Sequence, residues 1–319
     1  MHPKRTSYRQ IAAAAGVSHM TLYRVLNHAP NVTEATREKV IRIMKQLGCI
    51  DARLPSGCSV VIYADANNYM CKYADILARK LHDFPVTVRQ FHAERNKSAF
   101  LRMIETASSL VYFEFMPERL LEECRERNPD LKIICINGSE GDINIGCDYF
   151  QQGRMAAEYI HSRGFRNLGI VLGKYAEGNP FYPGLYDRAM GCLHYWMYKY
   201  GHDKPELILD LDSCFAEKRS FPSVFFAVNT HLSDRLIQTA EQHHLKLLKD
   251  YSLLTVGRPE DDLNQHPDVD CVYHEPKDML EIAVSFLFNP NLNKIHSKIT
   301  INVQNNLKSY GTVRSFSRS

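Results

Sequence analysis

The sequence predicts an all-α head of three short helices followed by a larger α/β body. Residues 1–48 contain three helical stretches separated by turn signals, and from Ser59 onward short apolar runs alternate with amphipathic helical stretches. Charge divides the chain at the same place. Residues 1–53 hold nine basic and three acidic residues, a net +6, whereas the remaining 266 residues carry a net −3. A small basic head on a mildly acidic body is typical of a nucleic-acid-binding module joined to another domain.

Composition excludes several classes of protein. The chain has 319 residues, 45% of them hydrophobic and 24% charged, which is typical of globular rather than disordered or fibrous proteins. It has no run of about 18 apolar residues that could span a membrane. The first ten residues, MHPKRTSYRQ, lack the apolar core of a secretion signal, so we expect a cytoplasmic protein with no membrane partner. Nine cysteines without a CxxC pair indicate reduced thiols rather than a disulfide framework or a zinc site.

A glycine turn joins the first two predicted helices. Residues 8–15, YRQIAAAA, are rich in alanine, the best helix former, and Ser7 is well placed to cap them. Gly16 ends this helix because glycine readily adopts the left-handed conformation of a tight turn. Ser18 then caps a second helix over residues 19–27. The apolar side of that helix carries Leu22, Val25 and Leu26, and its exposed side carries His19, Met20, Tyr23 and Arg24.

The third helix completes the head. Thr33 caps it and Gly48 closes it, and its apolar stripe consists of Val40, Ile43, Met44 and Leu47. Three short helices with a glycine turn between the first two make a helix-turn-helix, which is a DNA-binding motif. The same pattern alone is also compatible with a small bundle that binds nothing.

The body predicts parallel sheets flanked by helices, because strand-like and helix-like segments alternate along it. No GxGxxG follows a predicted strand and no GxxxxGK[ST] occurs, so the sequence lacks the phosphate-binding loops of dinucleotide and P-loop proteins. Its histidines have no partners at metal-ligand spacing, and no nucleophile and base can be paired. We therefore expect no enzyme activity, no cofactor and no metal site.

The head resembles, without a gap, the DNA-binding headpiece of the lactose-repressor/galactose-repressor family of bacterial transcription regulators. The segment IAAAAGVSHMTLYRVLNHAPNVTEATREKVIRIMKQLG carries the resemblance. Its matching features are the AGVS turn, the pair Thr21 and Arg24, the Leu-Asn that ends the second helix, and TREKV in the third.

The resemblance implies a role for each matching position. In the family the second helix lies in the major groove, and the first two residues after the capping serine carry much of the base choice, which here are His19 and Met20. An imidazole can bond a purine edge, and a methionine offers apolar surface to a thymine methyl. Tyr23 would reach a base or pack against the neighbouring helix. Thr21 and Arg24 match positions that contact phosphate or base edges. Six further residues match positions that contact the DNA backbone: Ser7, Tyr8, Ser18, Asn27, Asn31 and Thr33.

The joint between head and body, residues 49–58, reads CIDARLPSGC. Family members have a hinge helix here that places an apolar residue in the minor groove. Ala52-Arg53-Leu54 could echo that motif, with Leu54 as the wedge. Pro55 and Gly57 end helices, however, so a plain linker is the alternative.

Residues 59–319 more faintly resemble the type I periplasmic-binding-protein fold of these regulators, in which two α/β lobes close on a ligand. The matches include Asp148, Gly153, Arg188 with Gly191, Asn229 and Gly257. Carried over, this resemblance implies an effector site containing Tyr69, Asp148, Arg188 and Asn229. Trp196 would form a wall of that site or pack between helices. The resemblance implies that the effector is a sugar or a related metabolite. Arg258 stands where relatives carry an aromatic residue and an aspartate, and its positive charge would allow an anionic effector instead.

Together these features predict a homodimeric transcription regulator, most simply a repressor, that binds a pseudo-palindromic operator under control of a small-molecule effector. One alternative is a ligand-blind DNA-binding protein with a vestigial cleft. Another is a solute-binding transport component, which the missing secretion signal and the intact headpiece disfavour.

Overall fold

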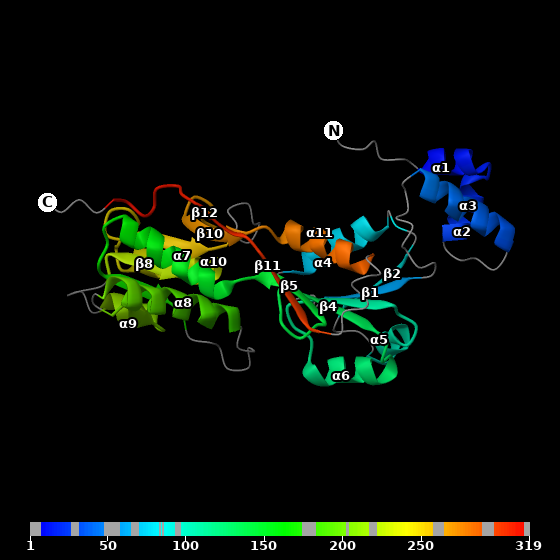
Figure 1. Cartoon of the computed structure of the whole chain (residues 1–319). Helices are drawn as coiled ribbons and strands as arrows, with labels where there is room; N and C mark the ends of the chain where they lie inside the picture. The colour runs from blue at the N-terminus through cyan, green and yellow to red at the C-terminus, as the bar shows by residue number, and fades with distance from the viewer. Residues whose placement is uncertain are drawn as a thin grey trace. The chain divides into compact units, whose positions relative to one another are not determined.

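The computed structural model describes residues 8–26, 32–47, 58–64, 70–82, 84, 86–92, 97–173, 183–201, 204–216, 222–257, 265–288 and 297–315. These residues form a helical head and two α/β lobes (Figure 1). No helix within these ranges is long and apolar enough to cross a membrane.

The head consists of α1 (Tyr8–Ala15), α2 (His19–Leu26) and α3 (Glu34–Gln46). Gly16 makes the predicted left-handed turn, with φ +61°, and the amide of Val17 donates to the carbonyl of Ala12 at 3.0 Å. The three helices bury one apolar cluster: Ile11, Ala12, Ala15, Leu22, Val25, Val40 and Met44. The prediction that Leu47 belongs to the buried stripe of α3 is wrong. The helix ends at Gln46, and Leu47 is 40% exposed.

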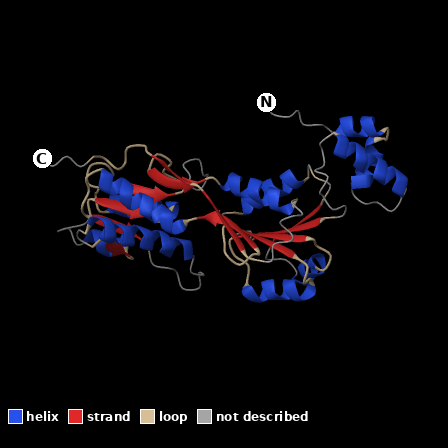
Figure 2. Cartoon of the chain, viewed as in Figure 1, coloured by secondary structure: helices blue, strands red, loops and turns tan. Residues whose placement is uncertain are grey.

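The first lobe contains a six-stranded sheet in the order β11-β5-β4-β3-β1-β2. Helices α4 and α11 cover one face of this sheet, and α5 and α6 cover the other (Figure 2). Its strands are β1 (Ser59–Ala64), β2 (Thr87–His92), β3 (Ser109–Phe113), β4 (Lys132–Ile136), β5 (Ile143–Cys147) and β11 (Ile299–Val303). Its helices are α4 (Cys71–Leu81), α5 (Lys97–Ile104), α6 (Glu118–Arg127) and α11 (Pro276–Leu287).

The second lobe contains another six-stranded sheet, in the order β12-β10-β9-β8-β6-β7. Its strands are β6 (Leu168–Val171), β7 (Glu206–Ile208), β8 (Val224–Ala227), β9 (Ser252–Val256), β10 (Asp270–His274) and β12 (Asn305–Lys308). Its helices are α7 (Tyr149–Ser162), α8 (Pro183–Tyr200), α9 (Leu211–Ala216) and α10 (Thr230–Gln242). Strands β6 to β10 pair in parallel, as predicted, whereas β12 runs antiparallel to β10.

The chain passes between the two compact units three times, after Gly146, Glu275 and Ile301. Three strands near these passages, β5, β11 and β12, were not predicted. Their sequences INIGC, ITINV and NNLK are short and interrupted by asparagine or glycine, so they lack the continuous apolar run that identified the other strands. The predicted architecture of a three-helix head and a two-lobed α/β body is otherwise confirmed.

Candidate nucleic-acid interface and effector site

Contacts near both ends of α2 fix this helix within the head. At its start, the amide of Thr21 donates to Oγ of Ser18 at 3.0 Å, and the Ser18 and Thr21 hydroxyls are 2.8 Å apart. Ser18 is therefore an N-cap, as predicted. Near its end, Nη1 of Arg37 on α3 donates to the carbonyl of Val25 at 3.2 Å. These bonds supplement the apolar core and hold α2 as a rigid element.

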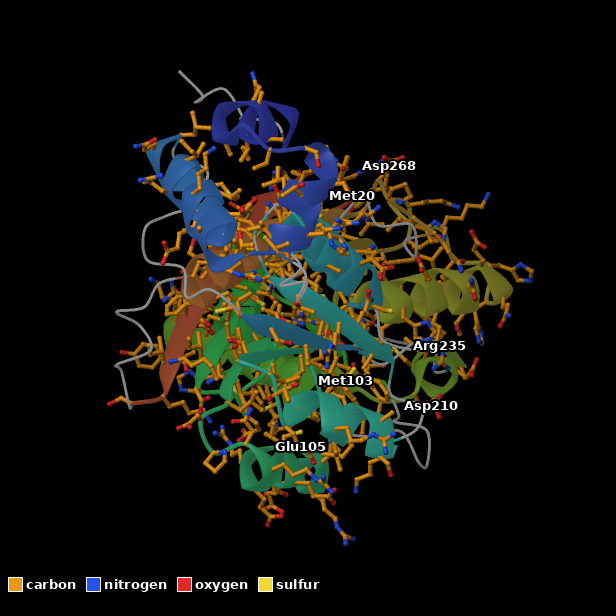
Figure 3. The ribbon with its side chains drawn as sticks, turned by 90° about the vertical axis from the view of Figure 1, so that its right-hand side faces the viewer. Met20, Met103, Glu105, Asp210, Arg235 and Asp268 are labelled. Carbon is orange, nitrogen blue, oxygen red and sulfur yellow. The ribbon has the colours of Figure 1, made fainter. Side chains whose placement is uncertain are left out.

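The outer surface of α2 presents His19, Met20 and Arg24, all of them exposed. Met20, labelled in Figure 3, is 57% exposed, although methionine is usually buried. Residues four apart share a helix face, so Met20 and Arg24 lie side by side. An apolar tip, an imidazole and a guanidinium on one short helix can together contact thymine methyls, base edges and phosphates.

The other predicted DNA contacts are only partly described. Thr33 caps α3, since the amide of Thr36 donates to its hydroxyl at 3.3 Å. Ser7, Asn27, Asn31 and Leu54 lie outside the described residues, as do the side chains of Tyr8 and Tyr23.

In the second lobe, α7 and α8 are in backbone contact at two glycines. A Cβ atom at Gly153 would lie 2.0 Å from the carbonyl oxygen of Arg188, and one at Gly191 would lie 2.1 Å from that of Phe150. No other residue type could occupy either position without separating the helices. This contact brings Arg188 of α8 against the first turns of α7.

Arg188 is 7% exposed, and within the described residues its guanidinium has three neutral partners. Nε donates to Oε1 of Gln152 at 2.8 Å, and Nη1 donates to the carbonyl of Val228 at 3.0 Å. The guanidinium carbon also lies 4.9 Å from the ring centre of Tyr149. None of these partners is a carboxylate, so a buried positive charge is held by dipoles and an aromatic ring.

Asp148 and Asn229 lie beside these partners of Arg188 in the chain. Both begin helices directly after the carboxyl end of a strand. The Asp148 side chain accepts from the amide of Gln151 at 2.8 Å, and the Asn229 side chain accepts from the amide of Leu232 at 2.8 Å. Asp148 follows β5 of the first sheet, but its carbonyl accepts from Nδ2 of Asn305, which pairs with His274 at the carboxyl end of β10. Three predicted effector residues therefore lie near the carboxyl edge of the second sheet, where ligands bind in open α/β sheets.

Trp196 lies elsewhere. It has no exposed surface, and it makes edge contacts with His161, 5.7 Å between ring centres, and with Tyr200 at 5.6 Å. This burial favours the packing alternative over a wall of the effector site. Tyr69 and Arg258 lie outside the described residues.

A residue pair that the sequence did not single out occupies the carboxyl edge of the first sheet. Glu114 follows β3 and Asn137 follows β4, and both have left-handed backbones, with φ +58° and +65°. Nδ2 of Asn137 donates to Oε1 of Glu114 at 3.0 Å. Non-glycine residues in this conformation often mark ligand sites. The available signal was a polar residue directly after each apolar run.

The remaining question at the site level is whether the described residues include a metal site or reactive cysteines. In the part of the chain that the structure describes, no group of three His, Cys, Asp or Glu residues is arranged to hold a metal ion. The eight cysteines in that part are free thiols. Burial raises the pKa of the Cys124 and Cys147 thiols to about 12, so both stay protonated at neutral pH.

Residues 8–50 match the family model described as "Bacterial regulatory proteins, lacI family". Catabolite control protein A of Staphylococcus epidermidis is 24% identical to this chain over 187 residues. That match covers 52% of this chain and 55% of the relative, so the chain spans about half the length of the curated relative it matches.

Two solved structures resemble the whole chain or most of it. The Lac repressor dimer bound to operator and the anti-inducer ONPF superposes with a TM-score of 0.65 at 16% identity, covering 98% of this chain and 100% of that one. A LacI family regulator from Enterococcus faecium with bound ribose superposes with a TM-score of 0.63 at 14% identity, covering 81% and 100%. Residues 8–50 therefore form a helix-turn-helix that matches the model of the lacI family of bacterial regulatory proteins, and the body has the fold of solved regulators from that family.

Proposed function

We propose that the protein is a transcriptional repressor that binds operator DNA through the exposed face of α2. The observation that carries this proposal is the surface of His19, Met20 and Arg24 on a capped helix. The net charge of +6 on residues 1–53 supports it, because phosphate binding needs clustered cations. In this proposal residues 1–48 bind DNA, and residues 49–58 connect that head to the body. Residues 59–319 bind the effector and form the dimer contact. Such a regulator acts in the cytoplasm, where the operator is.

A dimer follows from the size of the head. One helix-turn-helix covers a half-site of a few base pairs, and two heads are needed for affinity and for recognition of half-site spacing. The operator is then pseudo-palindromic. The Lac repressor, a dimer bound to operator, has the same fold and supports this arrangement.

The effector is a small polar molecule that contacts Arg188 together with Asp148 and Asn229. Planar guanidinium and amide groups bond sugar hydroxyls, carboxylates and phosphates. The Enterococcus faecium regulator with bound ribose supports a sugar as one candidate class.

Base recognition is tested with variants of α2. His19→Ala and Met20→Ala each lose contacts to base edges, so each should weaken binding to the preferred sequence by about 1–3 kcal/mol, roughly tenfold or more. Gln46→Ala, at an exposed position at the end of α3, is the control and should bind like the wild type. Affinities are measured at fixed salt on the preferred DNA and on DNA with one base pair changed. Unchanged base preference in the double variant His19→Ala, Met20→Ala would contradict the proposal.

The ligand-blind alternative has one observation in its favour, namely that Nε and Nη1 of Arg188 are already bonded within the lobe. Thermal-shift screening of the full chain against sugars, sugar phosphates and nucleosides separates the two proposals. A stabilising compound whose effect disappears in Arg188→Met supports an effector site. No stabilising compound supports the ligand-blind regulator.

A further inference from the structure

Gln152 is a buried amide on a helix face that is otherwise small or apolar. Its side chain has no exposed surface, and the other buried residues of α7 are Gly153, Ala156, Ala157 and Ile160. Burying an amide without hydrogen bonds is unfavourable, so a glutamine is tolerated in such a stripe only if its hydrogen-bond partners compensate for the lost water.

The two ends of the Gln152 amide contact different parts of the second lobe. Oε1 accepts from Nε of Arg188 at 2.8 Å. Nε2 donates to Oδ1 of Asn305 at 2.9 Å, and it lies 3.3 Å from Nδ1 of His274 and 3.6 Å from Sγ of Cys147. The two N–H groups of Nε2 can donate to two of these three acceptors at a time, and the shortest distance is to Asn305. One planar group thus joins the arginine of the effector site to this set of acceptors.

These three acceptors lie at the three passages of the chain between units. The chain passes after Gly146, after Glu275 and after Ile301. Cys147 directly follows the first passage, His274 precedes the second by one residue, and Asn305 opens the strand that follows the third. We call residues 143–150, 272–278 and 299–306 the crossover segments.

Asn305 extends the same network. Its Nδ2 donates to the carbonyl of Asp148 at 2.9 Å and to Oε1 of Gln151 at 2.8 Å. The first and third crossover segments are therefore bonded directly to each other as well as through Gln152.

We propose that Gln152 is a positioning residue that couples Arg188 to the three crossover segments. The inference rests on the proposed function, in which Arg188 contacts the effector. A ligand that moves the guanidinium changes the bond that holds Oε1 of Gln152 in place. Because the amide is planar and rigid, Oε1 and Nε2 move together. The bonds that Nε2 makes therefore change as well. Effector binding at Arg188 thus reaches the segments in which the chain passes from one unit to the other.

Hydrogen exchange of the full chain tests this coupling without DNA or effector. Gln152→Leu should speed amide exchange in the crossover segments at least about tenfold more than in the rest of the second lobe. Arg188→Met, which keeps an unbranched apolar stem but removes the guanidinium and its bonds, should speed exchange in the same segments to a smaller extent. The double variant should exchange no faster there than Gln152→Leu alone, because the effect of Arg188 passes through Gln152.

Two further variants separate coupling from stability. Thr312→Val is the matched control, since the Thr312 hydroxyl is buried in the same lobe with two hydrogen bonds, to the amide of Asp270 and the carbonyl of Leu253. It should speed exchange without preference for the crossover segments. Gln152→Glu keeps the acceptor for Arg188 but loses the donor, so it should loosen the crossover segments as Gln152→Leu does.

Each remaining outcome overturns the proposal. Uniform exchange across the lobe in both Gln152 variants, no change in either, or additive effects in the double variant would assign Gln152 a packing role only. Failure of the proposed function is seen separately, as the absence of a preferred DNA sequence for the wild type.

Discussion

At the scale of single residues, the buried carboxylate of Asp270 holds the backbone of residues 310–313 in place. This carboxylate is fully buried and accepts from the backbone amides of Tyr310, Gly311, Thr312 and Val313, and from the hydroxyl of Tyr159 at 2.8 Å. The Ser309 hydroxyl is a sixth donor, at 3.4 Å. A charged acceptor with this many donors is strongly stabilised. It fixes the segment that follows β12 against β10.

Removing that carboxylate should therefore destabilise the second lobe. Asp270→Ala leaves several buried amides without partners, and we expect the free energy of unfolding to fall by at least about 3 kcal/mol. Asp268→Ala, at an exposed position two residues away (Figure 3), is the control and should change it by less than about 0.5 kcal/mol. Urea denaturation with both variants measures the difference. Equal midpoints for the two would show that Asp270 is not a stabilising centre.

Residue roles could be predicted only in part. The cap Ser18 and the exposed positions of His19 and Met20 follow from local spacing, whereas the DNA-contact role of these residues comes from the family resemblance and stays a prediction. The Arg188 side chain was identified, but its partner Gln152 was missed, since a hydrogen bond between residues 36 positions apart leaves no local pattern. A glutamine within an apolar stripe was the one available signal.

At the scale of elements, the contact between α7 and α8 depends on glycine. A methyl group at Gly191 would lie 2.1 Å from the carbonyl of Phe150, so Gly191→Ala must separate the helices. We expect the free energy of unfolding to fall by about 1–3 kcal/mol, as is typical of overpacking. We also expect Arg188, on the same helix, to be displaced. Gly146→Ala is the control, because the nearest atom to its Cβ would be Cα of Asn137 at 3.9 Å. Thermal denaturation that ranks the two variants equally would contradict the close contact.

Elements with continuous apolar runs were predicted well, and those without them were missed. The helices of the head follow from helical spacing and capping residues, and strands such as β1 and β8 follow from short continuous apolar runs. Strand β5 contains Asn144 and Gly146, and its place in the sheet comes from pairing with β4. Asn144 is tolerated there because its amide bonds both backbone groups of Gly141, at 2.8 and 3.1 Å. Such compensation is tertiary and invisible in a short sequence window.

At the scale of the whole molecule, charge is divided between two parts with different roles. The head carries +6 and the rest of the chain −3. If two heads neutralise several phosphates, binding to DNA must release counterions. We expect the logarithm of the association constant to fall against the logarithm of salt concentration with a slope on the order of −5. Titrations of the preferred DNA at several salt concentrations measure it, and a flat dependence would exclude phosphate binding by the head.

The central claim is that the chain binds DNA as a symmetric pair of helix-turn-helix heads, and selection from a random DNA pool with the full-length protein tests it most directly. The account predicts enrichment of a two-fold symmetric sequence whose half-sites lie about one helical turn apart, or a multiple of it. It also predicts that two copies of the chain bind each site. No enriched sequence, or an enriched sequence without symmetry bound by one copy, would contradict it.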